Sequence, residues 1–148
     1  MKTLICLSTL VLLVLFAHPL HAQQERFLIW VFDQGSADSQ FGYYNGSAAV
    51  DVGGVFKDYD VEGLACLQSV IYGTSGHDGH RSSELFTIRI DAANNQATLN
   101  KVGDIASSDH QPYFEVAALA EKSDGSLWGY ADDGNQRGII RIDPTTAV

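Results

Sequence analysis

The run Asp58-Tyr59-Asp60-Val61-Glu62 carries a carboxylate at every second position. Side chains alternate between the two faces of a β-strand, so a strand here would place Asp58, Asp60 and Glu62 on one side. Three carboxylates within about 13 Å of each other repel unless a cation or hydrogen-bond donors lie among them. Hard oxygen ligands suit Ca²⁺, and the run therefore predicts a calcium site. The alternative is a strand entry whose acids face water.

A second group of metal-ligand residue types lies in the run His77-Asp78-Gly79-His80. The imidazoles of His77 and His80, together with Asp78 or the nearby Glu84, are of the types that bind zinc or another transition metal. A glycine-rich loop does not fix two imidazoles as a helix would. An ordinary turn between two strands is therefore the alternative explanation of this run.

Residues of the serine-hydrolase type also occur together, as Ser107-Ser108-Asp109-His110. The Gly-x-Ser-x-Gly elbow of such enzymes is absent, and adjacency in sequence is not the geometry that a triad needs. No phosphate-binding loop, dinucleotide fingerprint or paired-cysteine metal motif appears either. The sequence therefore names no catalytic residue, and whether the protein is an enzyme stays open.

The first 22 residues have the parts of a secretory signal peptide. Lys2 supplies the positive start, residues 4–17 are almost wholly apolar, and His18 to Ala22 end the run in a small residue. We expect cleavage after Ala22, which leaves residues 23–148 as one secreted or periplasmic domain; the alternative is an uncleaved membrane anchor. Cys66 would then be the only cysteine, and its apolar neighbours predict a buried, inert thiol.

The whole chain carries 18 Asp and Glu against 9 Lys and Arg, a formal net charge of −9. This excess of negative charge disfavours nucleic acid and anionic membrane surfaces as partners, because both require a basic patch. It is compatible with cation binding, and also with an ordinary extracellular protein.

Two stretches of the chain repeat one another with a period of about 50 residues. Leu64 matches Leu119, and Tyr72 matches Trp128; the two copies end in Arg89-Ile90-Asp91 and Arg141-Ile142-Asp143. Glu115 falls at the place of Asp60, so the two copies would offer an acid at the same level. Each copy contains short runs rich in Ile, Val, Phe, Tyr and Thr, bounded by turn residues, which predict β-strands.

Two further segments upstream fit the same pattern. Residues 27–33 align with the strand that ends at Asp91, and residues 49–53 align with residues 98–103. The Gly/Ser/Asn-rich residues between them are predicted to be an insertion, whose Phe41, Tyr43 and Tyr44 form an aromatic binding platform or pack back onto the sheet. The predicted fold is all-β, with about two and a half four-stranded antiparallel units; a small open β-sandwich is the alternative.

The repeat resembles the blades of secreted bacterial β-propellers of phytase-like and esterase-like type. The motifs that carry the resemblance are Glu62-Gly63-Leu64-Ala65, Ile71-Tyr72-Gly73, Asp132-Asp133-Gly134 and Ile142-Asp143-Pro144-Thr145-Thr146. Such propellers include hydrolases and plain binding scaffolds, and their first strands line a central channel. The resemblance implies a secreted binding or interaction module of propeller type. The alternatives are a calcium-dependent esterase or phosphatase-like hydrolase, and a truncated fragment without function.

One feature departs from that family. A closed propeller has about four to eight blades, which is more than this sequence contains. Open sheet edges invite pairing with other chains. We therefore expect a homo-oligomer, a partner with the same kind of β-repeat, or a truncated relative of a longer propeller.

Overall fold

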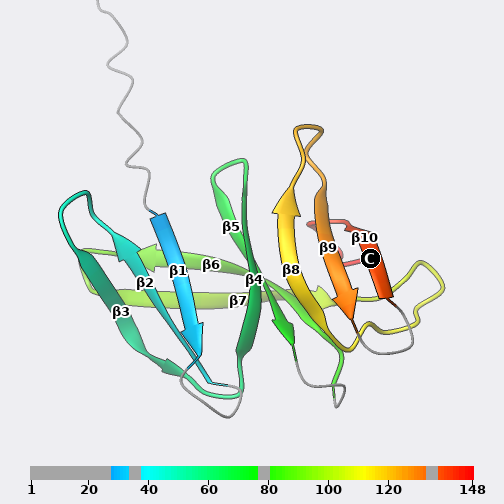
Figure 1. Ribbon diagram of the computed structural model, residues 1–148, viewed down its shortest axis with the longest axis horizontal. Helices are drawn as coiled ribbons and strands as arrows, with labels where there is room; N and C mark the ends of the chain where they lie inside the picture. Colours follow the sequence, from blue (N-terminus) through cyan, green and yellow to red (C-terminus); the bar gives the residue numbers. More distant parts are fainter. Residues whose placement is uncertain (1–27, 34–37, 77–80, 133–136) are drawn as a thin grey trace, which may run out of the picture.

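The computed structural model describes residues 28–33, 38–76, 81–132 and 137–148. These residues form ten β-strands and contain no helix. The strands make three antiparallel sheets. In Figure 1, β1–β3 lie at the left and β8–β10 at the right, and the long strands β6 and β7 of the middle sheet extend behind β1–β3. The prediction of an all-β fold with antiparallel sheets is confirmed.

Sheet 1 contains three strands in the order β1-β2-β3. Their bounds are β1 Leu28–Asp33, β2 Ser39–Tyr44 and β3 Ala49–Phe56. The predicted insertion is therefore wrong in part, because β2 lies inside it and pairs with both neighbours. The turn that follows β2 explains the polar composition: the Asn45 side chain accepts hydrogen bonds from the amides of Ser47 and Ala48, and Gly46 has a φ of 92°.

Sheet 2 contains four strands in the order β4-β5-β6-β7. Their bounds are β4 Asp60–Leu67, β5 Val70–Gly76, β6 Glu84–Asp91 and β7 Gln96–Asp104. The turn between β4 and β5 consists of Gln68 and Ser69, both with positive φ, as the twist of a two-residue hairpin requires. This sheet has the strand order that the sequence predicts for one complete unit.

Sheet 3 contains three strands in the order β10-β9-β8. Their bounds are β8 Val116–Glu121, β9 Leu127–Asp132 and β10 Arg137–Ile142. Asp124 and Gly125 lie at the tip of the hairpin between β8 and β9, where Asp124 Oδ1 accepts the amide of Ser126 at 3.0 Å and Gly125 has a φ of 84°. Strands β8 and β10 are the two edges of this sheet.

Sheets 2 and 3 repeat one another in register. Leu64 lies opposite Gly73 in sheet 2, and Leu119 lies opposite Gly129 in sheet 3. A β-bulge interrupts β4 between Val61 and Gly63, and another interrupts β8 at the matching place, between Val116 and Ala118. The sequence match of Leu64 to Leu119 is thus also a match in space.

The Arg-Ile-Asp motifs correspond less closely. Phe86 lies opposite Gly73, whereas Ile140 lies opposite Gly129, so β6 runs two residues further than β10 before its aspartate. Each aspartate nevertheless ends its strand in the same manner, because its carboxylate accepts the amide of the following turn, from Asn94 at 3.1 Å and from Thr145 at 2.7 Å. The side chains of Asn94 and Thr145 also donate to these carboxylates, and together with the amide hydrogen bonds they keep the pKa of Asp91 and of Asp143 below the usual value.

Two apolar clusters hold the sheets together, one between each consecutive pair. The first contains Phe41 of sheet 1 with Val61, Phe86 and Ile88 of sheet 2. The second joins sheets 2 and 3 and includes residues of the linker and the C-terminal turn: Leu67, Leu85, Ile105, Val116, Leu119, Leu127, Ile142 and Ala147. Burial of these side chains is the main favourable term in the packing of the sheets.

The same polar contact accompanies both packed interfaces. The hydroxyl of Ser39 accepts a hydrogen bond from the Val61 amide at 3.0 Å, and the hydroxyl of Ser83 accepts one from the Val116 amide at 2.9 Å. Val61 and Val116 are the residues before the two matching bulges, and both serines are buried. Each sheet is therefore attached to the next one by an equivalent serine. Because Ser39 lies in β2, this strand is the counterpart of β6, and the predicted alignment of residues 27–33 with the strand that ends at Asp91 is wrong.

Candidate functional site

The acidic run before sheet 2 does not lie on one strand face. Asp58 is in the turn before β4 with a φ of 61°, and its amide donates to Asp38 Oδ1 at 3.0 Å. Asp60 is the first residue of β4, and the bulge at Glu62 interrupts the alternation that the prediction assumed. The expectation that all three acids share one side of a strand is therefore wrong for Asp58, which lies outside β4.

Three acids do approach one another around Gly76. Asp60 lies opposite Gly76 in the β4–β5 pair, and Glu115 forms an isolated β-bridge with it. A β-carbon on Gly76 would lie 2.7 Å from Cγ of Glu62, so that side chain packs directly over the glycine. Within the described part of the chain, however, no three His, Cys, Asp or Glu residues are grouped so that they could hold a metal ion. Calcium binding by these acids stays a prediction.

The second predicted metal group, His77, Asp78 and His80, lies outside the described residues. The loop with Ser107, Asp109 and His110 is described, and it is a hydrogen-bonded turn. The Ser107 hydroxyl donates to the carboxylate of Asp109, which holds the pKa of that carboxyl below its usual value. His110 has a φ of 63° and is exposed. These contacts explain the residue types of the loop without a catalytic role.

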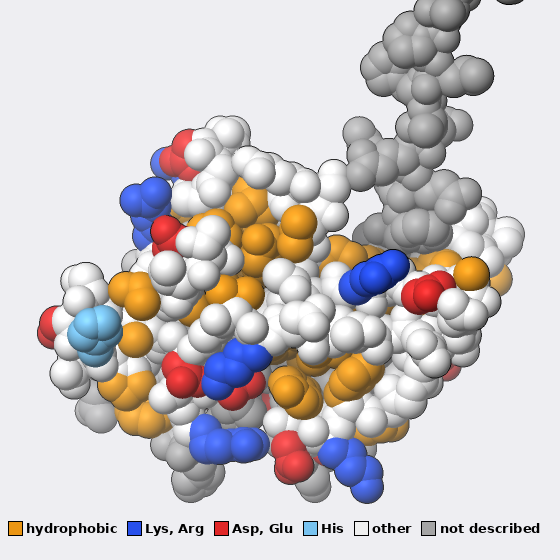
Figure 2. All heavy atoms as spheres, turned by 180° about the vertical axis from the view of Figure 1, so that it is seen from behind, with side chains coloured by type: hydrophobic (Ala, Val, Ile, Leu, Met, Phe, Trp, Pro, Cys, Tyr) orange, Lys and Arg blue, Asp and Glu red, His pale blue; other side chains and the backbone are white. Residues whose placement is uncertain are grey.

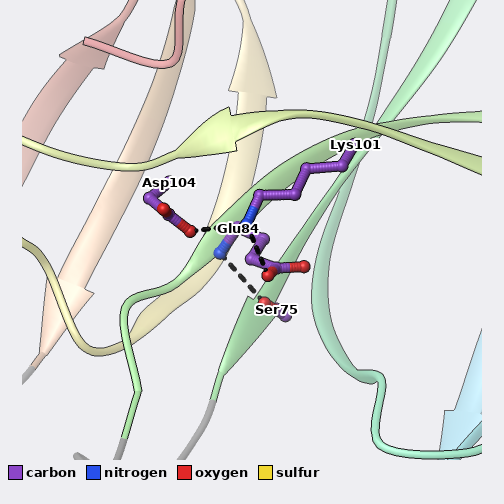
Figure 3. A network of polar contacts seen from close by, with 4 residues as sticks. All are labelled: Ser75, Glu84, Lys101 and Asp104. Carbon is purple, nitrogen blue, oxygen red and sulfur yellow. Dashed lines mark hydrogen bonds and ion pairs between the residues drawn. The ribbon is translucent and has the colours of Figure 1, made fainter.

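A lysine with two carboxylate partners connects the ends of β6 and β7 (Figure 3). Lys101 Nζ lies 2.7 Å from Asp104 Oδ1 and 2.7 Å from Glu84 Oε1, and these two hydrogen bonds raise the pKa of Lys101. The Glu84 amide donates to Ser75 Oγ, which adds β5 to the network. Because the lysine is held in its charged form, this group stabilises the sheet and is no candidate for a lysine nucleophile.

A depression of about 390 Å³ lies between two hairpin turns and is lined by Leu67, Gln68 and residues 121–125. Asp124 and Lys122 already pair there at 3.0 Å, and Lys122 Nζ lies 5.5 Å from the centre of the Trp128 ring. The Ser126 hydroxyl and the lysine lower the pKa of Asp124 to about 2. Small-molecule pockets are mostly apolar with a few polar groups, and this charged lining differs from them.

The three aromatic side chains of the predicted insertion have different surroundings. Phe41 is fully buried and Tyr43 nearly so, whereas Tyr44 is 42% exposed and its hydroxyl donates to the carbonyl oxygen of Gly46. The first two therefore pack onto the sheet and form no aromatic platform.

The prediction for Cys66 is wrong: the thiol is exposed, because Cys66 lies at the end of β4 and belongs to neither apolar cluster.

Hydrophobic side chains reach the surface in separate groups (Figure 2). Ile139 of β10 is the most exposed large one among the described residues, at 73%. Its cross-strand neighbours are Tyr130 and, beyond it, Ala118. We call Ala118, Tyr130 and Ile139 the outer row of sheet 3. Ala118 is also exposed, and Tyr130 is 40% exposed.

The outer row has a buried counterpart in sheet 2. The matching cross-strand neighbours there are Gly63, Thr74 and Leu85. Thr74 and Leu85 are fully buried, and the Thr74 hydroxyl donates to the carbonyl oxygen of Val116 in β8 at 2.9 Å. Sheet 3 thus covers this row of sheet 2, whereas no described residue covers the outer row to the same degree.

Two arginines flank the outer row along β10. Arg141 lies opposite Trp128, two residues beyond Ile139, and Arg137 lies opposite Asp132, two residues before it. Arg137 Nε pairs with Asp132 Oδ1 at 2.6 Å. The sequence motifs do not indicate this surface, although adjacent isoleucines at positions 139 and 140 place apolar side chains on both faces of one strand. That pattern is typical of strands that are buried on both sides.

No protein-family model matches the chain, and no curated protein or solved structure is significantly similar to it. In the part of the chain that the structure describes, no helix has the length and apolar character needed to cross a membrane. The candidate surface is therefore judged on its own geometry.

Proposed function

We propose that this protein is a secreted, non-enzymatic binding module of β-propeller type, in which the three sheets are successive blades and the outer row of sheet 3 is the contact surface. One observation carries the proposal. Ile139 is 73% exposed, whereas Leu85, at the matching place in sheet 2, is fully buried. The shared register of the two sheets and their equivalent bulges support the comparison of these two residues.

The exposed apolar side chains supply the driving force for binding. Burial of apolar surface contributes about 25 cal/mol per Å², and full burial of an isoleucine side chain about 1.5–3 kcal/mol. The row is also continuous, because its members are direct neighbours across three strands. An apolar row on the face of a sheet suits the face of another protein better than it suits a small molecule, which prefers a concave site.

The flanking charges indicate which kind of protein would bind. Arg137 and Arg141 lie on either side of Ile139 along β10; Asp132 pairs with Arg137, so the row has an excess of positive charge at Arg141. Interfaces pair complementary potentials, and like charges that face each other suppress wrong partners. The partner should therefore present an apolar surface with acidic groups beside it.

Calcium-dependent hydrolysis, the alternative that the family resemblance implies, stays a prediction. No geometry of the described residues favours it: the acids around Gly76 form no metal-holding group, and Ser107 bonds within its own turn. Turnover of a chromogenic ester or phosphoester that a chelator abolishes and calcium restores would support it against the binding module.

Photo-crosslinking tests the contact surface. Benzoylphenylalanine replaces Arg141 in β10, and in a control chain it replaces the exposed Thr98 of β7. After irradiation in the fluid into which the host exports the protein, we expect a discrete product from position 141 that Ile139→Asp in the same chain removes, and none from position 98. Equal products from both positions, or no product from position 141, would contradict the proposal.

A further inference from the structure

We infer that the partner on the outer row is a second copy of this chain, which covers the row with the free face of its own sheet 1. This inference rests on the proposed function, because it names the partner of the same surface. The contact is head-to-tail, since different faces of the two copies meet. Such a heterologous contact produces rings or open chains of copies and no symmetric pair.

The first argument is the repetition of the packing inside the chain. Phe41 of sheet 1 is buried against Val61 of sheet 2, and Leu85 of sheet 2 is buried in one cluster with Val116 of sheet 3. Sheet 2 thus covers the Phe41 face of sheet 1, and sheet 3 covers the Leu85 face of sheet 2. Each covering sheet does so with the face opposite to the one that carries its own residue of this kind. The matching residue of sheet 3 is Ile139, so a sheet that covers Ile139 should also do so with the face opposite to its own matching residue.

In sheet 1 this face is the one opposite to Phe41, and no other described sheet covers it. Phe41 points toward sheet 2, so its neighbours Gln40 and Gly42 point away from it, as does Tyr44. Asp51 lies opposite Gly42 in β3 and is on that same face. Gly42 is buried, whereas Tyr44 is 42% exposed and Asp51 is exposed, so the accessible part of this face offers one apolar group and one acid for contact.

The second argument comes from hydrogen-bond chemistry. Ser39 and Ser83 lie two residues before Phe41 and Leu85, and their hydroxyls accept the amide of the next sheet. Arg137 stands at the matching place, two residues before Ile139. Its Nε already pairs with Asp132 within sheet 3. The remaining N–H groups of the guanidinium only donate hydrogen bonds, so a sheet that covers this position must present acceptors. A carboxylate such as Asp51 fits this requirement.

Charge also decides between the two ways in which copies could meet. If the outer rows of two copies faced each other, each row would bring Arg137 and Arg141 with only one acid, Asp132, which pairs with Arg137. The remaining positive charge on both sides of the contact disfavours that arrangement. If the free face of sheet 1 covers the row, Asp51 adds an acid beside Arg141. The head-to-tail contact is therefore the complementary one.

The contact between copies should be looser than the contacts within the chain. A β-carbon on Gly63 would lie 2.8 Å from the Leu119 amide nitrogen, so β8 approaches β4 as closely as a glycine allows. Ala118 stands at the matching place in sheet 3 and already has a β-carbon. A second copy must therefore rest on Tyr130 and Ile139, farther from β8, and the assembly should be reversible.

Light scattering and sedimentation of the purified protein, over micromolar to millimolar concentrations, test the inference. The wild type should associate reversibly, and Ile139→Asp should weaken association about tenfold or more, because it removes an apolar contact. Asp51→Arg should weaken it as well. Ala92→Asp, which adds the same charge to the exposed turn after β6, should not. Circular dichroism of each variant shows that the sheets remain.

A mixture of the two weakened variants gives the sharpest result. Ile139→Asp copies keep an intact sheet 1, and Asp51→Arg copies keep an intact outer row, so an equimolar mixture should form one-to-one dimers that stop there. Wild type that stays monomeric throughout, or association that Ile139→Asp does not weaken, would overturn the inference. A crosslinked product at position 141 with a different protein would also overturn it and leave the proposed function standing.

Discussion

Gly63 in β4 lies so close to Leu119 in β8 that a β-carbon on the glycine would come within 2.8 Å of the leucine amide nitrogen. The same β-carbon would lie 2.5 Å from Thr74 Oγ1, the hydroxyl that donates to the carbonyl oxygen of Val116. The close approach of sheets 2 and 3 thus depends on the absence of one side chain. Sheet 3 has no such glycine in its outer row.

Gly63→Ala is predicted to destabilise the protein by about 1–3 kcal/mol, because the added methyl group overpacks the interface between β4 and β8. Urea unfolding of the purified protein measures the loss. Gly54→Ala is the matched control, since no atom lies within 4 Å of its added β-carbon. Equal stability of the Gly63→Ala variant and the wild type would show that the two sheets are not packed as described.

Ser83→Ala and Ser39→Ala are predicted to cost about 1–3 kcal/mol each, because each leaves a buried backbone amide without its acceptor. The two losses should be similar, since the serines make equivalent bonds to Val116 and Val61. Thermal or urea unfolding provides the values, with the exposed Ser108→Ala as control. A loss at Ser83 alone would contradict the equivalence of the two interfaces.

Asp124 should titrate at a pKa of about 2. Because its folded pKa is lower than the usual 3.8, its stabilising contribution is present above that value and is lost as the pH falls through about 2. Ser126→Ala removes the largest cause and should move the pKa up toward 3.8. Carbonyl-detected NMR titration follows the group directly, and an unchanged pKa in the variant would disprove the assigned cause.

The contribution of Lys101 and its ion pairs to stability should depend on pH in the opposite direction to that of Asp124. The raised pKa of Lys101 means that its contribution is present below the usual 10.5 and is lost as the pH rises through the folded value. Its side chain is 44% exposed, so Lys101→Met should cost at most about 1 kcal/mol at neutral pH. Unfolding of both proteins at neutral and strongly alkaline pH should show the difference between them shrinking; a constant difference would argue against the ion pairs.

Local patterns predicted much of the architecture. Leu64 and Leu119 could be matched from sequence because each is followed by a strand whose glycine, Gly73 or Gly129, lies opposite it, and the hairpin at Asp124-Gly125 follows from its turn residues. Strand β2 was missed because the polar residues around Phe41 and Tyr43 suggested a loop. The bulge at Glu62 was missed as well, because an extra residue in one strand is visible only against its partner.

The candidate surface depends on contacts that no local pattern contains. Leu85 and Ile139 are similar apolar residues in similar strands, and only the presence or absence of a following sheet makes one buried and the other exposed. Sequence periodicity can show that β10 has apolar side chains on both faces. It cannot show that the described chain covers only one of them.

The most direct test of the central claim is methyl NMR of Ile139 over a concentration series of the purified protein. If the outer row is the contact surface between copies, the Ile139 methyl signals should shift or broaden as the concentration rises. Those of Val70, which is 40% exposed at the turn after β4, should not change. Ile139 signals that remain constant while the protein associates, or that change only together with Val70, would contradict the claim.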